Sequence, residues 1–398
     1  KPADRLLMQE QDSVAGALGY PDSEELMRSI SAAGRLVGHA SDTTWYRVAR
    51  VTRRSSRRPF RKLGGRRSRA PLADGVVVQE DEVVLAADAR PERDPTLVLR
   101  AAAAAAQSGL HLAPHAVQRL AEESSPMPVP WPAGARDSFV SLLGAGRATL
   151  PVWEGLDQAG IWLALIPGWD VVRSAPQRNP VHRFTVDRHL VETAIQAAKY
   201  QRDVDRPDLL VVGALLHDIG KGRPGTDHTD VGVELIAELA PHLGFDEADS
   251  ATLTTLVRHH LLLPETATRR DLDDPATVQR VVDAVGDRST LELLYALTKA
   301  DAQATGPAAW SDWRAALIAE LVERVRVALA GGREIQPVPL SPEQQDSLDA
   351  RVTDVLVDTG APGDMLTVTV TSPDRVGLLA TVAGVLAANR LDVRAARA

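Results

Sequence analysis

The chain has 398 residues and a formal net charge of −8, which argues against a general nucleic-acid binder. It contains no cysteine, so disulfides, thiolate nucleophiles and thiolate zinc sites are excluded within these residues. The length predicts about two or three domains, and the lack of a signal peptide or of a run of about 18 apolar residues predicts a cytoplasmic protein that makes no membrane contact.

The first part of the chain predicts helices and one small hairpin. Apolar residues at three- and four-residue spacing predict helical structure over 9–50. Two β-branched runs around a polar turn predict a hairpin over 75–86, and an alanine-rich stretch predicts a helix over 96–107. The Pro-rich stretch 126–132 predicts a hinge between helices. We assign residues 1–145 to a helical N-terminal domain.

An arginine-rich segment interrupts this region. Residues 47–69 carry eleven basic side chains and no acidic one. A solvated or disordered loop is one interpretation, and a surface for a phosphorylated or acidic partner is the other. The sequence leaves both open.

The next part, residues 146–330, has an almost purely helical pattern and forms the predicted catalytic domain. The expected helices cover residues 185–203, 207–219, 227–240, 246–260, 275–285, 289–304 and 310–329. Their short connections predict an all-α bundle.

The C-terminal part changes character. Gly331-Gly332 followed by three prolines, at 337, 339 and 342, predicts the linker that we assign to 331–363, with a short helix near 343–357. The expected elements that follow are a strand over 365–371, an amphipathic helix over 376–388 and a strand over 391–396. They predict the opening βαβ unit of a small domain over 364–398.

The most informative motif is the adjacent pair His217-Asp218, at the end of an apolar helical stretch. Burying an imidazole beside a carboxylate is costly unless a charge neutralises them, and a divalent metal does so. His189, on another predicted helix, and Asp301, at the end of a third, complete a set of four ligands with open positions for water and substrate. We expect magnesium or manganese, with iron and zinc as alternatives.

Three neighbouring residues could take part in catalysis. Lys221 follows Asp218 by three positions, so its ammonium group could reach a phosphate oxygen or face the helix dipole. His228 and His260 could bind a second metal, hold phosphate or protonate a leaving group. We predict catalytic roles for all three.

Histidines cluster in this region: seven of the ten lie between positions 182 and 260. For His182 and His259 a functional and a structural role remain equally open. His242 follows a proline and is predicted to be a surface residue. The cluster as a whole predicts a metal-dependent hydrolase.

These motifs resemble those of a known family. The order of the four expected ligands resembles the HD superfamily of metal-dependent phosphohydrolases. More specifically, the chain resembles the bifunctional uridylyltransferase/uridylyl-removing enzymes that modify the PII nitrogen-signalling protein. The stretches that carry this likeness are 182–189, 217–222 with His228, 258–263, 267–275, and 300–306 followed by 310–313. The resemblance implies a mainly α fold and hydrolysis of the phosphodiester that joins UMP to a tyrosine of uridylylated PII.

Residues 371–379 resemble the start of an ACT domain, a ferredoxin-like module that senses glutamine in this family. The resemblance implies effector-binding roles for Asp374, Arg375 and Gly377. The family's transferase motif, Gly-Ser followed by Asp-x-Asp, is not found in this sequence. Because the chain starts without methionine and stops inside an expected strand, we expect it to be part of a longer protein with a truncated ACT unit.

Two other functions remain open from the sequence. The first is hydrolysis of a free nucleotide, such as a deoxynucleotide triphosphate or a guanosine alarmone. The second is a non-catalytic regulatory scaffold whose metal only stabilises the fold, against which the open coordination positions argue. An assay with uridylylated PII and with free nucleotides distinguishes these possibilities.

Overall fold

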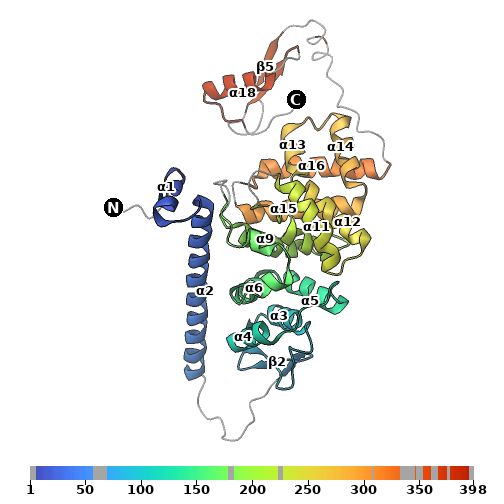
Figure 1. Cartoon of the computed structure of the whole chain (residues 1–398). Coiled ribbons are helices and arrows are strands. Elements are labelled where there is room, and N and C mark those ends of the chain that lie inside the picture. Colours follow the sequence, from blue (N-terminus) through green and yellow to red (C-terminus); the bar gives the residue numbers. More distant parts are fainter. Residues whose placement is uncertain are drawn as a thin grey trace. The chain divides into compact units, whose positions relative to one another are not determined.

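The computed structural model describes residues 6–56, 70–177, 183–222, 227–306, 309–331, 346, 353–359, 366–373 and 377–393. The chain divides into two compact units, one of residues 1–265 with 281–311 and one of residues 266–280 with 312–398. Helices make up most of the described residues (Figure 1), which confirms the predicted mainly α fold. None of the described helices combines the length and the apolar character needed to cross a membrane.

The chain begins with two helices, α1 (Met8–Leu18) and the long α2 (Ser23–Ser56). Gly19 ends α1 in the left-handed conformation, at φ +78°, where glycine carries no steric penalty. The predicted helical structure is therefore confirmed, with one break. Of the arginine-rich segment, residues 47–56 belong to α2. Residues 57–69 lie outside the described part of the chain.

A small sheet follows. Its strands are β1 (Ala70–Ala73), β2 (Val76–Gln79), β3 (Glu82–Leu85) and β4 (His111–Leu112), in that spatial order. The predicted hairpin is confirmed as β2 and β3, joined through Glu80 and Asp81, whose φ angles of 58° and 65° suit a two-residue hairpin turn. β1 and β4 were not predicted, because a two- to four-residue strand carries too little periodicity to be recognised.

Six helices connect this sheet to the bundle. They are α3 (Leu97–Ser108), α4 (Pro114–Glu123), α5 (Ala133–Gly144), α6 (Thr149–Gln158), α7 (Ile161–Leu165) and α8 (Trp169–Val172). The alanine-rich helix and the Pro-rich connection between α4 and α5 are confirmed. The rings of Trp153 and Trp162 stack with their centroids 4.0 Å apart and are fully buried, so these helices have an aromatic core of their own.

The bundle that follows contains the expected helices. They are α9 (Val186–Ala197), α10 (Pro207–Leu216), α11 (His228–His242), α12 (Glu247–His259) and α15 (Arg288–Thr305). α9 packs against α10 and α15, and α12 packs against α10, α11 and α15. The helix α10 lies at the centre because it is apolar on all sides, and its residues 209–216 are all buried. The carboxylates of Asp227, Asp246 and Asp287 each accept an N–H group in the first turn of the helix they precede.

Two shorter helices lie between α12 and α15 in the sequence, α13 (Leu262–Arg269) and α14 (Pro275–Val285). α14 agrees with the prediction. α13 was not predicted, because its apolar residues directly continue the pattern of α12.

The second unit contains α16 (Asp312–Leu329), β5 (Asp354–Asp358), β6 (Thr367–Thr371) and α18 (Leu378–Ala388). The predicted helix near 343–357 is wrong at its end, because the alternating Val355-Leu356-Val357 run pairs antiparallel with β6. The predicted strand over 365–371 and helix over 376–388 are confirmed as β6 and α18, whereas β5, which precedes them, was not predicted. Residues 391–393 form no strand, and 394–396 lie outside the described residues.

Candidate metal centre

The predicted ligands come together where three helices of the bundle meet. His189 lies in the first turns of α9, His217 and Asp218 directly follow α10, and Asp301 lies in α15. These residues, with two further histidines, form two sets of three metal-ligating side chains. In each set, the ligand atoms lie within 4.8 Å of one another.

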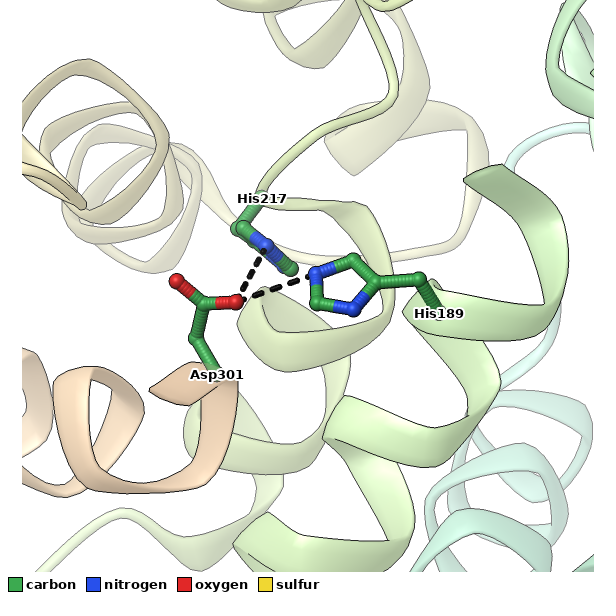
Figure 2. Close-up of side chains that lie close together, drawn as sticks. All are labelled: His189, His217 and Asp301. Atoms are coloured by element: carbon green, nitrogen blue, oxygen red, sulfur yellow. Dashed lines mark ion pairs between the residues drawn. The ribbon is translucent and has the colours of Figure 1, made fainter. Parts of the chain in front are cut away.

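The first set is His189, His217 and Asp301 (Figure 2). One oxygen of Asp301, Oδ1, lies 3.0 Å from Nε2 of His189 and 3.6 Å from Nε2 of His217. Both imidazole rings thus point at the same carboxylate oxygen. The two histidines are buried, whereas the Asp301 side chain is 22% exposed, so this set can be reached from one side.

The second set is Asp218, His228 and His260. Oδ1 of Asp218 lies 3.5 Å from Nε2 of His260 and 3.8 Å from Nε2 of His228. Its other oxygen, Oδ2, lies 3.3 Å from Nε2 of His217 and 2.5 Å from Nζ of Lys221. Oδ2 of Asp218 also lies 3.9 Å from Nε2 of His189, so all four predicted ligands come close together. Asp218 stands between the two sets, with one oxygen toward each.

Hydrogen bonds on the far side of two rings orient them toward the centre. Nδ1 of His217 lies 2.9 Å from the carbonyl oxygen of Ala214, and Nδ1 of His260 lies 2.7 Å from that of Val257. A carbonyl only accepts, so each Nδ1 donates and each Nε2 faces the centre. Nε2 of His217 and Oδ1 of Asp218 are buried and have no hydrogen-bond partner within the described part of the chain. Buried polar atoms without such partners fit a site that a metal completes.

The charges of the centre favour a cation. Burial alone would lower the pKa of His217, but Asp218 and Asp301 raise it to about 10. Burial would raise the pKa of Asp218, yet His217 and Lys221 hold it well below its usual range. Burial likewise opposes ionisation of Asp301, but the neighbouring imidazoles of His189 and His217 keep its pKa well below normal. Asp218 and Asp301 are therefore both ionised. Their negative charge can be balanced by a protonated histidine or, when the histidines are neutral, by a metal ion.

Gly220 fixes the spacing between the His-Asp pair and α11. A Cβ atom on Gly220 would lie 2.1 Å from the carbonyl oxygen of His228 and 2.4 Å from the backbone nitrogen of Gly232. We predict that Gly220→Ala forces the start of α11 away from Asp218, lowers the free energy of unfolding by about 1–3 kcal/mol and weakens metal binding. Thermal unfolding and metal titration measure both effects.

The matched control for Gly220→Ala is Gly134→Ala in α5. A Cβ atom on Gly134 meets no heavy atom within 4 Å, so alanine there should leave stability unchanged or raise it slightly. Equal behaviour of the two variants would contradict the role of Gly220.

The remaining histidines do not join the centre in the same way. His259 is half-buried, ends α12 and directly precedes His260. His242 is half-buried, and its ring lies 6.2 Å from that of Trp131. His242 is thus partly exposed at the end of α11, and its surface position stays a prediction. His182 lies outside the described residues.

The expected effector site is largely undescribed. Asp374 and Arg375 lie outside the described residues. Gly377 precedes α18 with a φ of +82°, a conformation that glycine adopts without strain. The glutamine-binding role of these three residues stays a prediction.

Comparisons with known proteins agree with this geometry. A model of the HD domain family matches residues 186–302, which include all six residues of the two sets and Lys221. A bifunctional uridylyltransferase/uridylyl-removing enzyme of Streptomyces coelicolor is 49% identical and covers 100% of this chain and 53% of its own length. An enzyme of the same name from Mycobacterium tuberculosis H37Rv is 44% identical over 99% of this chain and 48% of its own length.

A third relative with this name, from Corynebacterium glutamicum, is 36% identical over 85% of this chain and 48% of its own length. The chain thus spans about half the length of the curated relatives it matches. The likeness covers the helical N-terminal part as well as the bundle, and the bundle has the metal-ligating arrangement expected of an HD domain. The chain therefore belongs to the family of the bifunctional uridylyltransferase/uridylyl-removing enzymes and contains its HD domain.

Proposed function

We propose that the chain is a metal-dependent phosphodiesterase that removes UMP from uridylylated PII protein. The observation that carries this proposal is the pair of three-residue metal-ligating sets that meet at Asp218. Its setting in a chain homologous to enzymes named uridylyl-removing supports the substrate. The proposed metal ligands are His189, His217, Asp218 and Asp301, with His228 and His260 beside a second ion.

The bound metal, which we propose to be magnesium or manganese, supplies a water of lowered pKa and offsets charge on phosphoryl oxygens. The chain's own residues do the rest. The Lys221 side chain is 24% exposed, so its ammonium group can contact a bound phosphate as well as Asp218. There it would stabilise the negative charge that grows on the phosphoryl oxygens.

The leaving group is the tyrosine phenolate of PII, whose conjugate acid has a pKa of about 10. The bond between phosphorus and the tyrosine oxygen breaks as water adds to phosphorus, so UMP and tyrosine are the products. His228 is the most exposed imidazole of the centre, at 35%; when no second ion is bound to it, it is placed to donate the proton that the phenolate takes up. His260 is buried, and burial lowers its pKa despite the nearby Asp218. Its imidazole is therefore suited to stay neutral and to bind a metal ion.

The test is to incubate the chain with manganese and uridylylated PII and to follow UMP release by chromatography. Parallel reactions contain a deoxynucleotide triphosphate or a guanosine alarmone. We expect release from PII and little turnover of the free nucleotides. Turnover of a free nucleotide alone would replace the proposed substrate, and no metal-dependent turnover of any of them would favour the non-catalytic scaffold.

Further properties follow from the same proposal. We propose that the whole protein also transfers UMP to PII, that glutamine regulates it through the C-terminal unit, and that it acts in the cytoplasm without binding nucleic acid or membrane. We also keep the domain boundaries predicted from the sequence: 1–145, 146–330, 331–363 and 364–398. Residues 364–398, the regulatory module in this proposal, belong to the second unit of the fold.

A further inference from the structure

The long helix α2 is attached to its unit by charged side chains. Its apolar residues Ile30, Val37 and Trp45 are 47%, 69% and 68% exposed, whereas Arg28 and Arg35 contact other elements of the unit. A surface helix ordinarily buries its apolar face. Near its start α2 buries Leu26, which is 2% exposed, and further along Tyr46 stacks on His111. Between them, hydrogen bonds and ion pairs hold the helix against its unit.

Arg35 is the central contact. Its Nη2 lies 2.8 Å from Oε2 of Glu154 and 3.0 Å from Oδ2 of Asp157, and its Nη1 binds Oδ2 of Asp187. The Arg35 side chain is only 15% exposed, and those of Asp157 and Asp187 are 1% and 2% exposed. One guanidinium group thus holds three carboxylates that would otherwise repel one another in a poorly solvated place.

Asp187 links Arg35 to a helix of the metal centre. It lies in the first turn of α9, two residues before His189. While its Oδ2 binds Arg35, its Oδ1 accepts hydrogen bonds from the Thr185 hydroxyl at 2.6 Å and from the Arg188 backbone nitrogen at 2.8 Å. Because a helix rises about 1.5 Å per residue, this carboxylate is about one turn or less from the His189 backbone.

We propose that Arg35 is a positioning residue for the metal centre: through Asp187 it fixes the first turn of α9 and thereby holds the His189 ring against Asp301. The proposal rests on the proposed metal centre, and its test measures manganese binding and hydrogen exchange rather than hydrolysis. It also means that a displacement of α2 would shift the first turn of α9 and with it the proposed metal ligand His189.

A second contact of α2 reaches the segment that lies beside Gly222. Nη1 of Arg28 donates to the carbonyl oxygens of Val171, at 2.9 Å, and Arg173, at 2.8 Å. The same Val171 oxygen lies 2.9 Å from the position of a Cβ atom on Gly222, the residue after Lys221. α2 therefore supports both the helix that carries His189 and the segment against which the end of the His-Asp motif rests.

The experiment compares Arg35→Lys, Asp187→Asn and the double variant with Arg202→Lys, the same change at an exposed arginine. Lysine keeps the charge but cannot bridge three carboxylates. We expect Arg35→Lys to remain folded by circular dichroism, to weaken manganese binding measured by calorimetry about tenfold, and to speed hydrogen exchange in the first turn of α9 in the metal-free protein. The double variant should bind manganese no more weakly than the weaker-binding single variant. Arg202→Lys should match the wild type in both manganese affinity and hydrogen exchange.

A folded Arg35→Lys with wild-type manganese affinity and wild-type exchange overturns the proposal. If Arg35→Lys does not fold, the same two measurements on Asp187→Asn decide, since that variant removes the link and leaves the guanidinium in place. If the wild-type chain binds manganese but releases no UMP, the proposed function fails while the manganese affinities still decide the role of Arg35.

Discussion

Asp218→Asn is expected to abolish metal-dependent UMP release. Asp218 is the one side chain that faces both sets, with Oδ2 toward His217 and Oδ1 toward His228 and His260. Asparagine keeps the volume but removes the charge, and it turns one metal-facing oxygen into an N–H donor. A loss of about 4 kcal/mol of transition-state stabilisation corresponds to a fall of about 10³-fold in kcat, and we expect at least that in a steady-state assay.

The control for this variant is Asp203→Asn, the same change at an exposed position of the same unit. It should keep wild-type turnover. Circular dichroism must show that Asp218→Asn remains helical, so that the loss reports chemistry rather than unfolding. Substantial UMP release by a folded Asp218→Asn would remove the basis of the hydrolase assignment.

Much of the bundle could be predicted from the sequence because its signals are local. Apolar periodicity gave the helices, and the carboxylates of Asp227, Asp246 and Asp287 begin three of them through hydrogen bonds to residues two or three positions away. The adjacent His217-Asp218 pair was recognisable for the same reason, since its meaning depends on the helix that it ends.

Other features depend on contacts between distant residues and left no local signal. The division of the ligands into two sets follows from how α11 and α12 pack, which brings His228 and His260 to one oxygen of Asp218. The Arg35–Asp187 ion pair joins residues 152 positions apart, and an arginine on a surface helix gives no sign of such a partner. β5 was missed because its pairing with β6 outweighs the preference of the isolated segment.

Removal of divalent metal is expected to stop UMP release completely, and manganese or magnesium should restore it. Each set has three ligand atoms, and Asp218 faces the first set with Oδ2 and the second with Oδ1. We therefore expect calorimetry to give about two ions per chain. Metal should also raise the melting temperature, because an ion at a hundredfold excess over its Kd stabilises the fold by about 2.7 kcal/mol.

The variant His228→Gln separates the two sets. His228 belongs only to the second set and is 35% exposed, so its loss should lower the stoichiometry toward one ion while the fold persists. His115→Gln, at an exposed histidine of α4, should keep both ions. A wild-type stoichiometry of one, unchanged in His228→Gln, would show that the second set holds no metal. His228 would then be left with proton donation to the phenolate as its only role, and its loss should slow cleavage of a tyrosine ester more than that of a diester with a more acidic leaving group.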